Sequence, residues 1–192
     1  DYIEDIAQEI HDENNSRKLN EKEIKPIALD KMLSNIRLDL LHLNVEFDNW
    51  FSEKSLFTSG EFDDTMNQFE KDQHSFSENN AIWFKATDFG EEKDHVLIRT
   101  NLEPTYYATD IAYHRNKFLI RKYDTVIDIW GADHHGHISR LKSALESIGV
   151  DRSKLNILLY QLVSLKQGDD KVRASKRAGT IITTNELVEE VG

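Results

Sequence analysis

Two short segments in the second half of the chain carry residue types that could do phosphate chemistry. Residues 173–180 (RASKRAGT) are basic and glycine-ended, and residues 130–137 (WGADHHGH) mix small and polar side chains. Phosphate transfer requires positive charge on the developing negative oxygens. Ser175 offers a hydroxyl donor, Lys176 a point charge and Arg173 a forked donor. A shared site would indicate a nucleotide-dependent enzyme, whereas a basic solvated turn is the simpler interpretation of the first segment alone.

The second of these segments follows an apolar run at 125–130 that only Asp128 interrupts, a pattern typical of a strand in a parallel sheet. Ligands of such sheets bind at the carboxyl ends of the strands. The small Gly131 leaves room for a ligand there, and Asp133 and His134 are expected to reach it. Two other interpretations stay open at this point: a histidine-based metal site and a purely structural turn.

A third segment carries a phenol and a carboxylate one helical turn apart. Tyr106 and Asp110 lie four residues apart on a helix predicted from 104–105 to about 118, so they share one face. Such a pair suits a cationic ligand, through a charge-assisted hydrogen bond and an aromatic wall. The alternative is a surface aspartate beside a half-buried tyrosine, because charged side chains mostly face solvent.

Apolar spacing predicts the elements that must position these residues. Helices are expected over 2–12, from Pro26 to 43, over 62–71, 105–118 and 138–148, and from 183 onward, where Thr183 and Glu186 have capping-box spacing. Strands are expected over 45–51, 81–87, 95–99 and 125–130, of which 81–87 and 95–99 should pair as an antiparallel hairpin. The run 155–165 fits either a strand or a helix.

Composition indicates a soluble globular protein. Of the 192 residues 39% are hydrophobic and 31% are charged, and no run of 18 apolar residues predicts a transmembrane helix. The absence of cysteine excludes disulfides and cysteine metal sites and fits a cytoplasmic protein. Residues 1–80 hold 19 acids and 8 bases, whereas residues 81–192 hold 16 of each, so the acidic first region is a poor nucleic-acid platform. Because the chain starts at Asp1, we expect it to be a piece of a longer protein.

Three segments in this order resemble the bacterial arginyl-tRNA synthetases: 105–114 (TYYATDIAYH), 130–136 (WGADHHG) and 175–179 (SKRAG). The resemblance extends from about Ile24 to Gly192. It implies an α/β class I fold, in which the chain supplies the second half of a Rossmann-type parallel sheet with its helices, plus an α+β connective insertion with an antiparallel hairpin. Residues 1–100 would be the insertion and return hairpin, and residues 101–192 the carboxyl-terminal half of the Rossmann domain.

The resemblance also implies a two-step reaction. The carboxylate of L-arginine attacks the α-phosphorus of ATP, which is a substrate and is accompanied by Mg²⁺, and the arginyl-adenylate then passes its arginyl group to tRNA. The family is cytoplasmic and needs no membrane, and the parent protein is expected to be a monomer. Tyr106 and Asp110 match positions that hold the guanidinium of arginine, and Asp133 matches a position at the same pocket. Gly131 and His134 lie where the nucleotide should bind.

The basic loop matches the Lys-Met-Ser-Lys-Ser loop of the family, which would steady the triphosphate in the transition state. Arg173, Ser175 and Lys176 fall on this loop, Arg173 and Lys176 as ATP contacts, and Lys176 should carry most of its effect. Arg173 and Ala174 replace the usual Lys-Met, and arginine is not an equivalent donor. The His-Ile-Gly-His half of the site is absent; the His-x-Gly-His string at 134–137 is interpreted as accidental because it lies too close to the loop. We therefore predict that the chain alone is inactive.

Two other classes of function are compatible with the residues. A non-catalytic module that binds arginine or a nucleotide would use the same side chains without turnover. A histidine-based metal hydrolase would use the histidines of 134–137.

Overall fold

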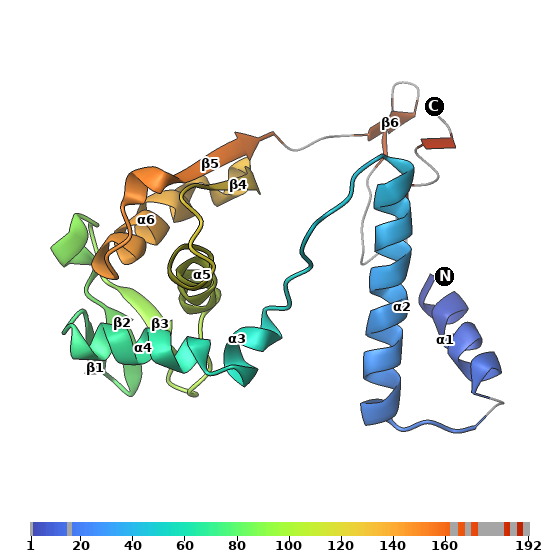
Figure 1. Ribbon diagram of the computed structural model, residues 1–192, viewed down its shortest axis with the longest axis horizontal. Helices are drawn as coiled ribbons and strands as arrows, with labels where there is room; N and C mark the ends of the chain where they lie inside the picture. Colours follow the sequence, from blue (N-terminus) through green and yellow to red (C-terminus); the bar gives the residue numbers. More distant parts are fainter. Residues whose placement is uncertain are drawn as a thin grey trace. The chain divides into compact units, whose positions relative to one another are not determined.

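The computed structural model describes residues 2–14, 17–161, 165–167, 170–172, 183–184 and 188–189. The chain forms two compact units: residues 1–50 with 164–192, and residues 51–163 (Figure 1). All residues of the basic loop at 173–180 lie outside the described residues, as does Glu186 of the predicted capping box.

The first unit contains a pair of helices. α1 (Tyr2–Glu13) packs its buried Ile6 and Ile10 against α2 (Glu21–His42), and the ammonium of Lys31 on α2 lies 3.1 Å and 2.7 Å from carboxylates of Glu9 and Glu13. In the same unit β6 (Leu165–Gln167) and β7 (Asp170–Val172) pair antiparallel. The helix expected over 2–12 is confirmed by this arrangement.

The predicted start of the second helix was wrong. α2 begins at Glu21 rather than at Pro26, because Asn20 and Glu23 form a capping box that satisfies the free N–H groups of the first turn. The side chain of Asn20 accepts hydrogen bonds from Lys22 N and Glu23 N, and the Glu23 carboxylate accepts one from Asn20 N. Pro26 lies inside the helix.

The strand predicted over 45–51 was also wrong. Residues 45–51 are irregular, although their alternation of apolar and polar side chains suggested a strand. No neighbouring strand of the described chain pairs with them, and alternation without a partner provides no ladder of hydrogen bonds. Phe47 and Trp50 instead contact each other edge to face, with ring centroids 5.6 Å apart, and the Arg37 guanidinium stacks over the Trp50 ring at 4.9 Å.

The second unit begins with α3 (Lys54–Thr58) and α4 (Glu61–Lys71), followed by an antiparallel sheet of β1 (Ser75–Glu78), β2 (Ala81–Phe84) and β3 (His95–Ile98). The helix expected over 62–71 and the hairpin of the second and third strands are confirmed. β1 was not predicted, because its sequence SFSE is short and mostly polar. Phe69 of α4 meets Phe84 of β2 edge to face with ring centroids 5.1 Å apart, and both rings are fully buried.

The rest of this unit is an α/β arrangement. α5 (Tyr106–Arg115) continues into a π-helical turn (Asn116–Ile120). β4 (Val126–Gly131) leads through a 3-10 segment (Ala132–His137) into α6 (Ile138–Ser147). β5 (Leu155–Tyr160) then pairs parallel with β4. The expected helices and parallel strand are confirmed, and the ambiguous run after Leu155 is a strand. The core includes Leu56, Phe69, Phe84, Leu97, Ile111, Leu141, Leu145 and Leu155.

The parallel pair is covered on one face only within this chain. Val126 of β4 and Leu155 of β5 are buried against the helices, whereas Ile127 and Ile129 on the other face are 61% and 68% exposed. Strands of parallel sheets are normally covered on both faces. This pair differs because two strands with helices on one side cannot shield the second face. No helix among the described residues is long and apolar enough to cross a membrane.

Candidate functional site

The first turn of α5 presents the phenol and the carboxylate. Thr105 caps this helix, accepting a hydrogen bond from Ala108 N, and its hydroxyl lies 2.9 Å from the carbonyl oxygen of Val96 on β3. Tyr106 is 82% exposed and Asp110 is also exposed, so the two predicted ligand side chains reach solvent from one helix. The cap therefore fixes their helix against the antiparallel sheet.

The helix face next to these two side chains is buried. It consists of Tyr107, Ile111, His114 and Phe118, whose spacing is that of one helical stripe. The Tyr107 hydroxyl donates a hydrogen bond of 2.6 Å to the carbonyl oxygen of Arg140, and burial raises the pKa of this tyrosine. α5 is thus joined to α6 as well as to β3.

Asp128, the one polar interruption of the apolar strand, lies in a buried cluster. Its Oδ2 is 2.6 Å from His114 Nε2 and its Oδ1 is 2.8 Å from Lys117 Nζ. Burial alone would raise the pKa of Asp128, but the hydrogen bonds and charges of His114 and Lys117 outweigh burial and lower it to about 2. Asp128 is therefore a carboxylate at neutral pH, and β4 is tied to α5 through an ion pair.

His114 joins α5 to β4 through both of its ring nitrogens. Nε2 lies 2.6 Å from the carboxylate of Asp128, and Nδ1 lies 2.7 Å from the backbone carbonyl oxygen of Asp110. The ring therefore contacts the helical turn that carries Asp110.

The electrostatics of Asp110 follow from this surrounding. Asp110 is exposed as a residue, but the atoms packed around its carboxyl partly desolvate that group and raise its pKa above the ordinary value. His114 opposes this effect, Glu53 and Asp128 raise the pKa further, and Lys117 lowers it. A bound cation would lower the pKa of Asp110 and so favour its charged form. The carboxylates of Glu53 and Asp128 act in the opposite direction.

The end of β4 carries the second group of predicted residues. Gly131 leaves space for the Asp133 side chain, because a Cβ atom there would come within 2.5 Å of Oδ1 of Asp133 and would displace that exposed carboxylate. Asp133 and His134 are exposed, and His134 Nε2 lies 3.8 Å from Asp133 Oδ2. The turn therefore displays both side chains to solvent, and their predicted contact with a ligand stays a prediction.

The structure brings only some of the predicted residues together. Tyr106 and Asp110 share one helical turn, and Gly131, Asp133 and His134 share another turn. Within the described part of the chain, neither a hydrogen bond nor an ion pair joins the two groups. Arg173, Ser175 and Lys176 lie outside the described residues. The predicted convergence of all three segments stays a prediction.

The metal interpretation gains no geometric support. Among residues 2–14, 17–161 and the shorter described stretches, no three histidine, aspartate or glutamate side chains are placed to hold one ion. The rings of His134 and His137 lie 5.6 Å apart between centroids, without a third ligand beside them.

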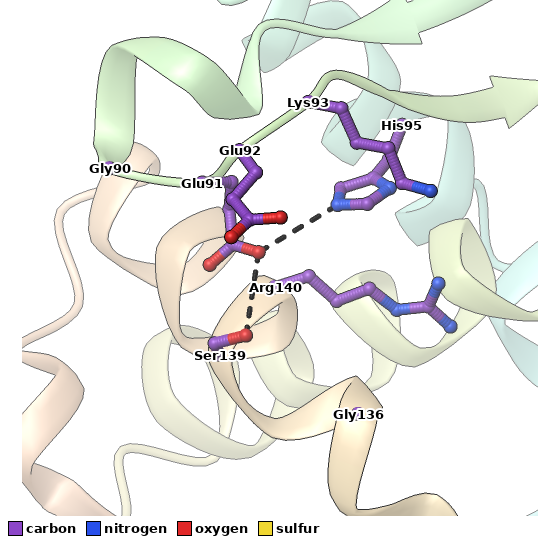
Figure 2. A pocket seen from close by; sticks show the side chains of 8 residues that line it. All are labelled: Gly90, Glu91, Glu92, Lys93, His95, Gly136, Ser139 and Arg140. Atoms are coloured by element: carbon purple, nitrogen blue, oxygen red, sulfur yellow. Dashed lines mark hydrogen bonds and ion pairs between the residues drawn. The ribbon is translucent and has the colours of Figure 1, made fainter.

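Sequence reasoning missed a pocket between the loop after residue 89 and the first turn of α6. Figure 2 shows its lining side chains, which include Glu91, Lys93, His95 and Arg140. Its volume is about 420 Å³. The two lining segments lie about 45 residues apart in sequence, so no local pattern links them. The unusual density of charge at 91–95 was the only available signal.

No family model matches the chain. The chain is 50% identical over 175 residues to the arginine–tRNA ligase of Carboxydothermus hydrogenoformans, covering 91% of this chain and 31% of that protein. It is 42% identical to the corresponding ligase of Dehalococcoides mccartyi, covering 100% of this chain and 35% of that protein. The chain therefore spans about a third of the length of these curated relatives.

Solved structures agree with the sequence relatives. An arginyl-tRNA synthetase structure from Campylobacter jejuni superimposes with a TM-score of 0.86 at 34% identity, covering 100% of this chain and 42% of that one. The arginyl-tRNA synthetase of Thermus thermophilus superimposes with a TM-score of 0.70 over 88% of this chain and 33% of that one, and at 20% identity it supports the fold alone.

Proposed function

We propose that this chain, which is homologous over most of its length to a segment of the arginyl-tRNA synthetases, contributes the arginine pocket and part of the nucleotide site to an enzyme that ligates L-arginine to tRNA. The observation that carries the proposal is 42–50% identity to arginine–tRNA ligases over at least nine-tenths of the chain. The exposed Tyr106 and Asp110 on one helical turn supply a chemical reason for arginine as the amino acid.

Asp110 and Tyr106 would bind the guanidinium group. A carboxylate accepts charge-assisted hydrogen bonds from the planar guanidinium fork, and an aromatic ring offers a surface for the cation. The buried His114 ring contacts the backbone carbonyl oxygen of Asp110 and thereby holds the turn that carries both side chains. Asp133, at the end of β4, would border the same pocket.

Gly131 and His134 would border the nucleotide. The arginine carboxylate would attack the α-phosphorus of ATP with departure of pyrophosphate, and the terminal ribose hydroxyl of tRNA would then accept the arginyl group. Mg²⁺ would accompany ATP, because this ion is held largely by phosphate oxygens and water rather than by a dedicated protein cage. Arg173, Ser175 and Lys176 would place donors on the triphosphate as its charge develops. We place this reaction in the cytoplasm and expect a monomeric full-length protein.

The parallel pair of strands fits one half of a larger Rossmann-type sheet. Parallel sheets are normally covered on both faces, and Ile127 and Ile129 expose the second face of β4 in this chain. We propose that further strands and helices of a full-length protein cover this face. In that arrangement residues 101–192 are the carboxyl-terminal half of the Rossmann domain and residues 1–100 the connective insertion and return hairpin.

Aminoacylation by the full-length protein tests the proposal. The protein encoded by the complete reading frame should charge tRNA with arginine and should not charge it with lysine, whose ammonium lacks the planar fork. Arginine binding without turnover would instead identify a non-catalytic binding module, and activity with another amino acid would refute the assignment of the pocket.

A further inference from the structure

A buried charged cluster joins the two elements that carry the candidate ligand residues. α5 presents Asp110, and β4 contains Asp128 and ends at Gly131. The Asp128 carboxylate contacts His114 of α5 at 2.6 Å and Lys117 of the π-helical turn at 2.8 Å. In the part of the chain that the structure describes, these are the side-chain hydrogen bonds and ion pairs between the helix with its turn and the strand. We call His114, Lys117 and Asp128 the charged cluster.

His114 extends the charged cluster to the turn that carries Asp110. Its Nε2 lies beside Asp128, and its Nδ1 lies 2.7 Å from the backbone carbonyl oxygen of Asp110. The residue is only 3% exposed, so its packed surroundings hold the ring in this orientation. Because the imidazole ring is planar and stiff, a displacement of the strand at Asp128 is transmitted to the backbone of Asp110.

Lys117 is positioned by aromatic rings as well as by the carboxylate. Its Nζ lies 4.4 Å from the centroid of the Tyr113 ring, and Phe51 stacks on the same ring with centroids 4.4 Å apart. The neighbouring Asn116 donates a hydrogen bond of 2.7 Å to Glu61 and so fixes the π-helical turn against α4. The ammonium therefore meets the strand from a well-supported position.

The chemistry of the charged cluster indicates that it fixes a geometry. Apolar side chains of similar volume often stabilise a fold as well as a buried ion pair does, because burying charge costs free energy. Burial would raise the pKa of Asp128, but its hydrogen bonds and charged partners lower the pKa to about 2, so their attraction outweighs the lost hydration. Apolar contacts are non-directional, whereas hydrogen bonds to both oxygens of one carboxylate fix distance and orientation.

We propose that the charged cluster aligns the two substrates of the ligase reaction, by setting the position of Asp110 relative to the strand end at Gly131 and His134. This inference rests on the proposed function, in which Asp110 binds the guanidinium and the strand end borders the nucleotide. The arginine carboxylate must meet the α-phosphorus at close range, and a small misplacement of one reactant slows such a step strongly. In this proposal the members of the cluster are positioning residues, since none of them contacts a substrate.

The test is steady-state aminoacylation by the full-length protein carrying Asp128→Asn, with the exposed Asp124→Asn as the matched control. Asp128→Asn keeps the shape and removes the charge that both partners contact. It should raise the arginine KM and lower kcat, each by about fivefold or more, and should leave the ATP KM within about twofold. The control should change none of the three parameters. Partial unfolding cannot mimic this result, because KM does not depend on the fraction of folded enzyme.

Lys117→Met is a second variant, which keeps an unbranched side chain over the Tyr113 ring and removes the ammonium. It should show the same rise in the arginine KM with a nearly unchanged ATP KM. An unchanged arginine KM in both Asp128→Asn and Lys117→Met would overturn the inference. An equal rise of the arginine and ATP KM values would also overturn it, because that result identifies a general loosening of the fold.

A double-mutant cycle shows whether the charged cluster acts through Asp110. In a protein that already carries Asp110→Asn, the addition of Asp128→Asn should change the arginine KM little, because the contact that the cluster positions has been removed. A double variant whose KM rises by the product of the two single effects would overturn the inference and leave the proposed function intact. An unmodified full-length protein that does not charge tRNA with arginine would overturn both.

Discussion

His114 Nε2 lies 2.6 Å from Oδ2 of Asp128, in a buried pair that ties the helix of the proposed arginine pocket to the parallel strand beside it. The other ring nitrogen, 2.7 Å from the carbonyl oxygen of Asp110, continues the link to the turn that would contact the substrate. The Lys117 ammonium lies 2.8 Å from Oδ1, the other carboxylate oxygen of Asp128. The position of the pocket therefore depends on a charged cluster that does not itself reach the ligand.

The first prediction concerns acid stability. Because the pKa of Asp128 is lowered to about 2 in the folded chain, its carboxylate stabilises the fold at pH values above its unfolded pKa of about 4, and this contribution is lost as the pH falls toward 2. Asp128→Asn should lower the free energy of unfolding at pH 7 by about 2–3 kcal/mol and flatten its pH dependence between 5 and 2. Urea unfolding at several pH values measures both effects. The exposed Asp124→Asn serves as the control, and an unchanged stability of Asp128→Asn would contradict the assignment.

The second prediction concerns the helix cap. Thr105→Ala removes the side-chain acceptor of Ala108 N and the contact of the hydroxyl with Val96 O. Stability should fall by about 1–2 kcal/mol, as is typical for loss of an N-cap. Thr105→Ser keeps the oxygen and should retain most of the stability. Thermal unfolding of the two variants measures both stabilities. An equal loss of stability in Thr105→Ala and Thr105→Ser would show that the hydroxyl group does not stabilise the helix.

The third prediction concerns the basic loop. Lys176→Ala in the full-length protein should reduce kcat for aminoacylation at least a hundredfold and change the affinity for arginine little, because the loop is proposed to act on the transition state. Steady-state kinetics separate the two parameters. A large rise in the arginine KM with normal kcat would assign Lys176 to substrate binding instead.

The fourth prediction concerns the chain by itself. It spans about a third of the length of its curated relatives, and its sequence contains no His-Ile-Gly-His segment, so under the proposed function it would hold only part of the nucleotide site. The 192-residue chain should therefore show no ATP–pyrophosphate exchange above background with arginine and tRNA present. Exchange activity would refute this part of the proposal.

Local patterns in the sequence predicted those elements whose burial is periodic. The apolar stripes of α4, α5 and α6 and the hairpin of β2 and β3 were found because each has one buried face. The strand predicted over 45–51 is absent because alternating apolar and polar residues do not by themselves supply a neighbouring strand to pair with. α2 starts five residues before Pro26 because the Asn20–Glu23 capping box, and not the proline, begins the helix.

The candidate site was only partly predictable for a different reason. Tyr106 and Asp110 are one turn apart, so helical geometry alone places them together. The pairing of the buried His114 with Asp128 depends on tertiary contacts that no local pattern encodes. The pocket at Arg140 was missed because its two walls meet only in the folded chain.

The most direct test of the account is the arginine KM of the full-length protein carrying Asp110→Asn. Removing the charge while keeping the shape should raise this KM more than tenfold, because hydrogen bonds to charged groups contribute about 1.5–3 kcal/mol. The exposed Asp124→Asn controls for loss of a surface charge and should leave KM unchanged. An arginine KM for Asp110→Asn equal to that of the unmodified protein would contradict the assigned pocket.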